Sequence, residues 1–413
     1  MKKRIFAQIA ALVVAFAVLS GCGINVGNSG FGSTRTDPQA QTITVSEGEG
    51  QVVSLLQTPA ADYVKAMKNV VIKGNDYCFN DEAGKGVEVA DFWNKNTNVS
   101  QANVVRLKWK TTKAPYNVYL ATNSSFDEAH EYFTNANEII VSNLRMATTY
   151  FWKVKNASGE ENKTSYFSTE DTVRAMETGY VNNVRDLGGR MTSSGKRVKQ
   201  GIIYRGAEMN IQSYKDENGG FHAINLRKRE LDTLKNDLKI GTEIDFRTDA
   251  ETLSMTKSPL GDEVSYYRYP IASYTGMFCK HSNGSEKPEM RDYYQKTLRL
   301  LATATEDNAA YFHCWGGADR TGTIGFLING LLGVSYTDLL IDFEMTTFSN
   351  NYRMRRDDPD NYNHFESMVN ELIANYRKSE DETISTVVER YMRECLKLTE
   401  ADITALKTNL IED

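Results

Sequence analysis

Residues 308–333 read NAAYFHCWGGADRTGTIGFLINGLLG and decide the fold. Residues 308–312 are typical of the end of a buried strand, and residues 313–320 make a short loop that contains two glycines. From Thr321 onward, apolar side chains recur at the spacing of a buried helix. The stretch therefore predicts a strand, a tight loop and the N-terminus of a helix.

Five residues separate Cys314 from Arg320 in this loop. A loop of that length can curl so that successive backbone N–H groups point inward and form a nest for phosphoryl oxygens. The helix that follows would direct its positive end to the same point, and the planar guanidinium of Arg320 suits two oxygens. Gly316, Gly317 and Gly322 would let the backbone approach such a ligand. Cys314 would then lie under the phosphorus, in positive surroundings that favour a thiolate nucleophile.

A cysteine at a strand end is often a small buried hydrophobe, and a Cys-x5-Arg pair also occurs by chance. Here His313 precedes the cysteine, two glycines follow it, and the segment 319–322, DRTG, leads into an apolar helix. Sulfur transfer and arsenate reduction also use cysteine loops. The pattern HC-x5-RTG favours phosphate ester hydrolysis over both.

The loop HCWGGADRTG resembles the phosphate loop of the bacterial tyrosine and phosphoinositide phosphatases, whose usual form is HCxxGKDRTG. Other segments resemble further motifs of that family: Asn183–Gly189 (NFRDLGG), Ile203–Gly206 (LYRS), Ile244–Glu251 (DLRxxxE), Gly333–Ser335 (GVS) and Asp342–Thr346 (DYLLS). The likeness covers about residues 178–411.

The resemblance implies an α/β Cys-phosphatase domain over residues 175–413, with a central, mainly parallel sheet and helices on both faces. The active loop would lie at the carboxyl end of a central strand. Cys314 would attack phosphorus and form a phosphocysteine, while Arg320 and the loop amides hold the equatorial oxygens. The remaining loop residues would bind phosphate: His313, Trp315, Gly316, Gly317, Ala318 and Gly322. No cofactor is implied, and the scattered His and Cys residues predict no metal site.

The general acid is the least defined part of this prediction. No WPD sequence occurs in the chain. Asp319 is the family-like candidate, although it could instead form a salt bridge that shapes the loop, and Asp245 is the second choice. Thr321 is expected either to hydrogen-bond the thiolate or to cap the helix, and His313 to orient the loop.

Four further residues are predicted to support the site. Arg185 and Asp186, followed by two glycines, suggest a tight loop in which the two charges pair with each other, as a structural pair or as a substrate contact. Asp245 and Arg247 lie where a core strand is expected to end, a position where charges are often structural.

The substrate follows less directly from the sequence. Ala318 replaces the lysine usual in the family, which weakens the case for multiply charged phosphoinositides and leaves phosphotyrosine acceptable. Arg353, Arg355 and Arg356 are either a surface cluster or a lid over an anionic substrate. We therefore expect a protein tyrosine phosphatase, with a phosphoinositide or phytase-like inositol phosphate phosphatase, or a surface binding protein with an inactive domain, as alternatives. The net charge of −6 excludes a nucleic-acid footprint.

The first part of the chain predicts export. Residues 1–21 combine basic residues with an apolar run too short to span a membrane comfortably, as in a signal peptide. The ending LSGC resembles a lipobox, so Cys22 is expected to carry lipid and to anchor the protein at the membrane, outside the cytoplasm. A secretory signal with a chance cysteine and an uncleaved anchor are the alternatives. Residues 22–67 are predicted to be a flexible linker.

Residues 68–172 alternate polar and apolar side chains with period two, which predicts a β-sandwich. The segment 144–154 resembles a corner of fibronectin type III domains, with Tyr150 as the corner tyrosine. Trp109 and Trp152 are expected in the core, and the domain is expected to be a spacer or docking module. A chain that starts near Thr172 should then keep its activity.

Overall fold

The structure is a computed structural model that describes residues 39–413, except 49, 95–97, 210, 216–220, 253–254, 350–353 and 355. The side chains of 211–215 and 221–224 are not described either. The predicted signal peptide and Cys22 lie outside these residues. No helix in the described part of the chain has the length and apolar character needed to cross a membrane.

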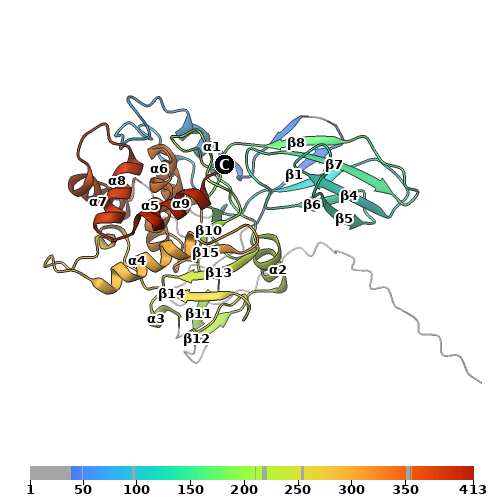
Figure 1. Cartoon of the computed structure of the whole chain (residues 1–413). Helices are drawn as coiled ribbons and strands as arrows, with labels where there is room; N and C mark the ends of the chain where they lie inside the picture. The colour runs from blue at the N-terminus through green and yellow to red at the C-terminus, as the bar shows by residue number, and fades with distance from the viewer. Residues whose placement is uncertain are drawn as a thin grey trace, which may run out of the picture. The chain divides into compact units, whose positions relative to one another are not determined.

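A five-stranded sheet carries the predicted active loop (Figure 1). Its order is β14 (Ser265–Arg268), β13 (Ile240–Asp245), β15 (Ala309–His313), β10 (Ile203–Gly206) and β9 (Arg185–Asp186). All neighbours are parallel except β9, which runs antiparallel to β10. The predicted strand is therefore the central one of a mainly parallel sheet, and all five of its residues are buried.

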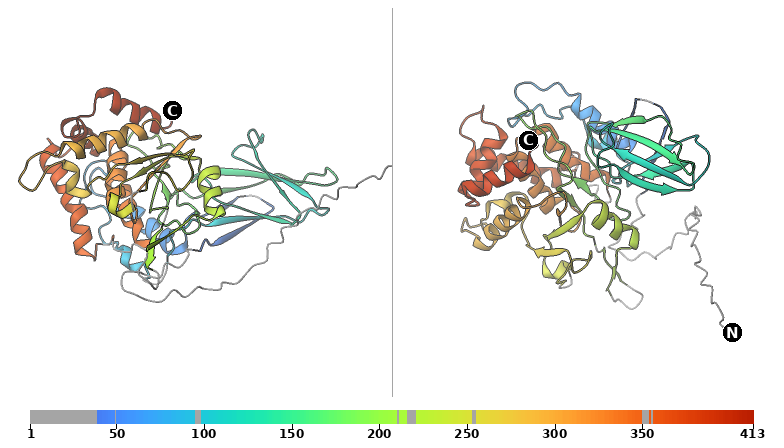
Figure 2. Two further views of the ribbon diagram at one scale, coloured as in Figure 1. Left: turned by 90° about the horizontal axis from the view of Figure 1, so that it is seen from below. Right: turned by 45° about the vertical axis from the view of Figure 1, so that its right-hand side comes forward.

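The two faces of this sheet belong to two different cores. Ala310 and Phe312 pack in the larger core, whereas Ala309 and Tyr311 pack in the smaller one, as the alternation of a strand requires. The larger core holds the following helices: α4 (Pro288–Leu301), α5 (Asp319–Leu331), α6 (Tyr336–Glu344), α7 (Pro359–Tyr376), α8 (Ile384–Glu394) and α9 (Glu400–Leu410). Figure 2 shows them gathered together beside the sheet.

The other face has far less helical cover than we expected. It is packed by α2 (Lys228–Asp232), the π-helical turn Thr233–Asp237 and the irregular segment 176–184. The prediction of helices on both faces is thus confirmed, but nearly all helical residues lie on one of them. A hairpin of β11 (Ile211–Lys215) and β12 (Phe221–Ile224) follows β10, and α3 (Asp249–Thr252) follows β13.

The predicted strands of the sandwich are present. One sheet has the order β1 (Thr42–Ser46), β3 (Val104–Lys108), β6 (Glu138–Val141). The other is β2 (Gln51–Val53), β8 (Ser165–Thr169), β7 (Thr149–Asn156), β4 (Tyr116–Ala121), β5 (His130–Thr134). Trp109 and Trp152 lie in the shared core, as predicted. Tyr150 Oη accepts a hydrogen bond from the Arg145 N–H at 2.7 Å, which is the expected corner contact. β1 and β2 pair parallel with β3 and β8.

The predicted boundaries of this part are wrong. Residues 42–68, which we expected in a flexible linker, form β1, β2 and α1 (Thr58–Lys68). Between β2 and β3, the 54–103 segment leaves the sandwich and packs into the larger core of the phosphatase domain through Leu56, Tyr63, Met67 and Val99. The segment has no regular periodicity over most of its length, so its sequence did not reveal which core it joins.

Candidate active site

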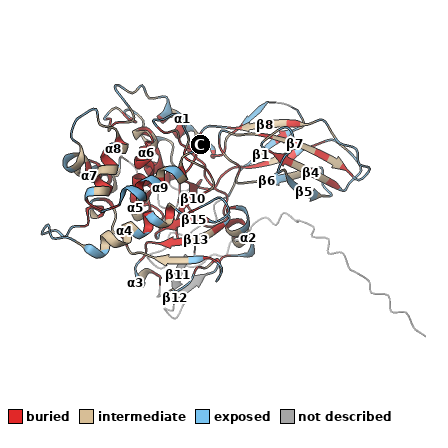
Figure 3. Ribbon diagram, in the orientation of Figure 1, coloured by how far each residue is buried: buried red, intermediate tan, exposed pale blue. Residues whose placement is uncertain are grey.

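The loop between β15 and α5 lies at the carboxyl end of the central strand, where it was predicted. Cys314 is buried, with 2% of its surface exposed (Figure 3). Gly317 has φ +67°, and a Cβ atom there would lie 2.4 Å from the carbonyl group of Gly206 at the end of β10. Glycine is therefore required at this position, both for its backbone conformation and for the close approach of two strand ends.

The carbonyl groups of the loop accept hydrogen bonds from its surroundings. His313 Nδ1 lies 3.1 Å from the carbonyl oxygen of Cys314. The backbone N–H of Glu208 donates to the carbonyl oxygen of Trp315 at 3.1 Å. The first two peptide units of the loop are therefore turned with their oxygens outward.

Two side chains from other motifs hold the next two carbonyls. Asn183 Nδ2 donates to the oxygens of Gly316 and Gly317, each at 3.1 Å. Arg205 Nη2 donates to the oxygen of Gly317 at 2.8 Å. Because the N–H of a trans peptide points opposite to its C=O, the amides of residues 315–318 face the inside of the loop. That is the nest expected for phosphoryl oxygens.

Asp342 of α6 binds the two arginines that stand behind the loop. Its carboxylate pairs with Arg205 and accepts from Arg185 Nε at 2.9 Å, and its backbone oxygen accepts from Arg185 Nη2 at 2.7 Å. Burial would raise the pKa of Asp342, but the guanidinium groups outweigh it and hold the pKa well below its usual range. Burial beside Arg205 lowers the pKa of Arg185 to about 10. Asp342 is therefore an anion that positions Arg205, a role that the sequence did not reveal.

The predicted pairing of Arg185 with Asp186 is wrong. Adjacent residues of a strand point to opposite faces, so Arg185 reaches Asp342 while Asp186 pairs with Arg174 at 2.5 Å. The Asp186 carboxylate also accepts from the N–H of Gly188 at 2.8 Å. Asp186 therefore shapes the turn after β9, and Arg185 acts on the phosphate loop through its neighbours.

His313 is fully buried behind the nucleophile. Its Nε2 lies 2.8 Å from Glu243 Oε1, and its Nδ1 lies 4.0 Å from Asp245 Oδ1. Burial alone would lower the pKa of His313, but the carboxylates of Asp245 and Glu243 raise it. The imidazolium can then donate to Glu243 and to the carbonyl of Cys314 together. This geometry agrees with the predicted orienting role.

Asp245 lies where it cannot serve as a general acid, so our second choice is wrong. It has no exposed surface. Arg247 donates to both of its oxygens, from Nε to Oδ1 at 2.9 Å and from Nη2 to Oδ2 at 2.7 Å. Tyr266 Oη adds a third donor at 2.9 Å. Although burial opposes it, the charges of His313 and Arg247 lower the pKa of Asp245, so it is a permanent buried anion. Arg247 is the structural partner that the strand-end position suggested.

Glu243, Asp245 and His313 also offer three ligand atoms within 4.8 Å of one another, close enough to hold a metal ion. However, Glu243 Oε1 already meets His313, and both oxygens of Asp245 meet Arg247. These contacts fit a charge network better than a metal site.

Arg320 is held in place by Glu251 of α3. The two residues form a bidentate pair, Nη1 to Oε2 at 2.8 Å and Nη2 to Oε1 at 2.6 Å, and Nη1 also donates to the Phe246 carbonyl at 3.0 Å. The hydrogen bonds from Arg320 lower the pKa of Glu251 to about 2. Burial would lower the pKa of Arg320, but Glu251 and the charge of Cys314 raise it. Sequence reasoning placed Glu251 in a family-like segment without assigning it this role.

Asp319 is the first residue of α5 and is partly exposed. Tyr274 Oη donates to Asp319 Oδ1 at 2.8 Å, and the Tyr274 N–H donates to Thr323 Oγ1 at 2.8 Å. The Tyr274 ring stacks on His364 with a centroid distance of 5.7 Å. Asp319 therefore remains at the rim of the loop, within reach of a leaving group, and Tyr274 orients it. Tyr274 gave no signal in the sequence.

Thr321 does not cap the helix, because the capping position is Ala318 and Thr321 lies within the first turn. The Thr321 hydroxyl is fully buried, and within the described residues it has no hydrogen-bond partner. This leaves the expected contact with the thiolate. Gly322 packs near Arg205, with its Cβ position 3.6 Å from Nη2.

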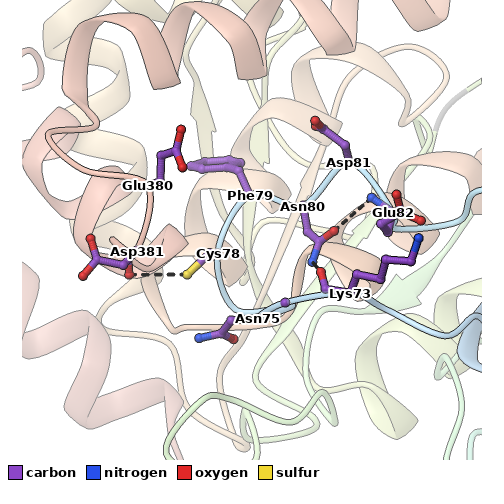
Figure 4. A pocket seen from close by; sticks show the side chains of 10 residues that line it. Lys73, Asn75, Cys78, Phe79, Asn80, Asp81, Glu82, Glu380 and Asp381 are labelled. Atoms are coloured by element: carbon purple, nitrogen blue, oxygen red, sulfur yellow. Dashed lines mark hydrogen bonds between the residues drawn. The ribbon is translucent and has the colours of Figure 1, made fainter.

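Two predicted features lie apart from the loop. Arg353 and Arg355 lie outside the described residues, and Arg356 donates to Glu344 at 2.8 Å, so this member of the cluster is structural. Figure 4 shows a cavity of about 550 Å³ whose lining contains no residue of the loop. Four carboxylates and one lysine line it: Asp81, Glu82, Glu380, Asp381 and Lys73. That charge does not suit a phosphate.

Comparison with known proteins agrees with this geometry. A family model described as "Tyrosine phosphatase family" matches residues 176–412, more than half of the chain. A Cupriavidus necator protein, named as a candidate tyrosine-protein phosphatase, is 25% identical over 178 residues. The match covers 40% of this chain and 59% of that protein. The core catalytic domain of the PP-IP phosphatase SIW14 from S. cerevisiae matches with a TM-score of 0.22 and 15% identity, over 42% of this chain and 86% of that one.

Proposed function

We propose that this chain, which belongs to the tyrosine phosphatase family, is a cysteine-dependent protein tyrosine phosphatase. The observation that carries the proposal is the loop itself. Its carbonyls are tied outward, its amides face inward, and Arg320 and the buried Cys314 stand at its two ends. A tetrahedral dianion with three equatorial oxygens is the ligand that such a ring of donors suits.

The reaction has two steps. Cys314 Sγ attacks phosphorus in line, the S–P bond forms, the bond from phosphorus to the leaving oxygen breaks, and Asp319 protonates that oxygen. Water then attacks the phosphocysteine and gives a proton to the Asp319 carboxylate, which releases phosphate and the thiolate. Arg320 and the inward amides stabilise the charge on the equatorial oxygens in both steps. The Thr321 hydroxyl stabilises Cys314 as the leaving thiolate in the second step.

The charges around the loop favour a substrate with a single phosphate. The buried arginines next to it are paired with carboxylates: Arg185 and Arg205 with Asp342, Arg247 with Asp245 and Glu208. Ala318 adds no cation at the position where the family has lysine. A polyphosphorylated inositol ring would need additional cations for its other phosphates.

Trp315 favours an aromatic substrate. It follows the nucleophile directly, and 48% of its surface is exposed, whereas its loop neighbours are buried. An exposed indole at the rim offers a flat apolar surface on which a phenyl ring can pack. An alkyl phosphate or a sugar phosphate would gain less from that surface.

The experiment is phosphate release from phosphotyrosine peptides, phosphoserine peptides, phosphoinositides and inositol hexakisphosphate, compared by kcat/KM. We expect the phosphotyrosine peptides to be the best substrates and the Cys314→Ser variant to turn over none of them. A preference for phosphoinositides or inositol phosphates would replace the proposed substrate but keep the chemistry. No turnover of any of them by a folded protein would favour the binding-protein alternative.

We also propose that the chain is exported and anchored through a lipid on Cys22, so that the phosphatase domain faces outside the cytoplasm. The signal-like residues 1–21 and the sequence LSGC support this proposal. The sandwich would then act as a spacer or docking module of fibronectin type III type. Its two sheets and the Tyr150 corner contact support that likeness.

A further inference from the structure

Two cysteines that are distant in sequence meet inside the phosphatase domain. Cys279 follows the 3-10 helix Tyr274–Phe278, and Cys395 follows the last residue of α8. Their thiols are hydrogen-bonded to each other. Both side chains are buried, with 1% and 8% of their surfaces exposed, and neither is in a disulfide.

Backbone contacts fix both cysteines in this arrangement. The Cys395 thiol donates to the carbonyl oxygen of Phe278 at 3.3 Å, and that residue directly precedes Cys279. The carbonyl of Cys279 accepts from the Lys287 N–H at 2.7 Å, and the carbonyl of Cys395 accepts from Arg291 Nε at 2.9 Å. The two sulfur atoms are therefore held together by the fold rather than by chance rotamers.

The electrostatics assign different roles to the two sulfurs. The hydrogen bond from Cys279, together with nearby Arg291 and Lys280, lowers the pKa of Cys395 to about 7. The same hydrogen bond and burial raise the pKa of Cys279. A thiol whose pKa is near the ambient pH attacks disulfides fastest. Cys395, the more exposed of the two, has the properties of the attacking thiolate.

We propose that Cys279 and Cys395 form a reversible dithiol–disulfide pair that exchanges with external disulfides. The Cys395 thiolate attacks one sulfur of a disulfide R–S–S–R, which forms a mixed disulfide and releases R–S⁻. Cys279 then loses its proton and attacks Cys395 Sγ, which forms the internal disulfide and releases the second R–S⁻. The external disulfide takes up the two electrons, and both R–S⁻ groups leave as thiols after protonation.

The cross-link would fasten the segment that orients Asp319. Tyr274, which donates to Asp319, begins the 3-10 helix that ends just before Cys279. Tyr391 Oη of α8 already holds this helix by donating to the Met277 carbonyl at 2.6 Å. A disulfide would add a covalent bond between the same two elements. Outside the cytoplasm, where we propose the chain to be, such disulfides persist.

The test uses the full chain with Cys314→Ser, so that the nucleophile cannot react and the result does not depend on the proposed catalysis. The protein is incubated with oxidised glutathione, unfolded in the presence of iodoacetamide and digested, and its peptides are weighed. We expect one linked pair of peptides that contain Cys279 and Cys395. The thermal midpoint of the oxidised protein should exceed that of the reduced protein by roughly 5–10 °C, because the bridge closes a long loop.

Matched variants separate this pair from other thiols. Adding Cys395→Ser should abolish both the linked peptides and the rise in the midpoint. Adding Cys78→Ser, which removes another buried thiol, should leave both unchanged. Recovery of Cys279 and Cys395 as alkylated thiols after oxidation, or a link from either of them to Cys78, would overturn the proposal.

Discussion

The 54–103 segment should be indispensable to the phosphatase domain, although it precedes most of the sandwich in the sequence. A chain that starts at Thr172 lacks Leu56, Tyr63, Met67 and Val89, which are buried in the larger core. Burial of each such side chain contributes ~1.5–3 kcal/mol. Their loss removes on the order of 10 kcal/mol, which is comparable with the whole ~5–15 kcal/mol stability of a domain. We therefore expect the truncated chain to be unfolded.

The segment also supports the active loop directly. The side chain of Gln101 donates to the Val181 carbonyl at 3.0 Å and accepts from the Thr178 N–H at 2.7 Å. These contacts fix the residues that lead to Asn183, which holds two carbonyls of the phosphate loop. Even a truncated chain that stayed compact should therefore lose activity.

A second shortened chain separates this segment from the sandwich. The N–H of Ala102 donates to the Met176 carbonyl at 3.3 Å, so residue 103 can be joined to residue 172 by a short glycine–serine linker. The chain 54–103–linker–172–413 should give a cooperative melting transition and cleave p-nitrophenyl phosphate at close to the full-length rate. Full activity in the chain that starts at Thr172, or an unfolded linked chain in spite of a sound linker, would refute the reasoning.

The remaining predictions concern single residues. Cys314→Ser should abolish turnover while a calorimetric titration still detects phosphate binding; measurable turnover would exclude the phosphocysteine. Asp319→Asn should slow an alkyl phosphate more than p-nitrophenyl phosphate by ~10²–10⁴-fold, and equal losses would exclude the acid role. Glu251→Gln should lower kcat/KM roughly 10²-fold by releasing Arg320. The pKa of about 2 for Glu251 lies below its usual 4.5, so in the parent chain its stabilising effect is present above pH 4.5 and is lost as the pH falls towards 2; a variant with the parent's acid-denaturation curve would contradict this. Cys22→Ala should lose lipid labelling in a bacterial host, and unchanged labelling would exclude this acceptor.

The sequence predicted what depends on neighbouring residues. The strand, loop and helix around Cys314 follow each other directly, so periodicity and glycine positions were enough to locate them. The sandwich strands carry their own alternation, and the corner tyrosine lies five residues from its partner. In each of these cases the contacts that matter are local.

The contacts that the sequence did not predict join residues far apart in the chain. Arg205 and Asp342 are separated by 137 positions, and Asn183 and Gly317 by 134. A side-chain pair of this kind leaves no periodic trace in either segment. Reading Arg185 and Asp186 as partners failed for a related reason, because their closeness in the sequence says nothing about the face of the strand to which each points.

The anions behind the loop explain why motifs so far apart belong together. A phosphate dianion needs donors that already point inward, since turning peptide units during the reaction would cost reorganisation energy. Asp342 holds Arg205, and Arg205 with Asn183 turns the carbonyls of Gly316 and Gly317 outward. The carboxylate of Asp342 can do this only as an anion, and its lowered pKa keeps it ionised at every pH above the usual range of an aspartate. A negative charge placed behind the loop thus prepares, through two steps of hydrogen bonding, the positive inner surface that meets the substrate.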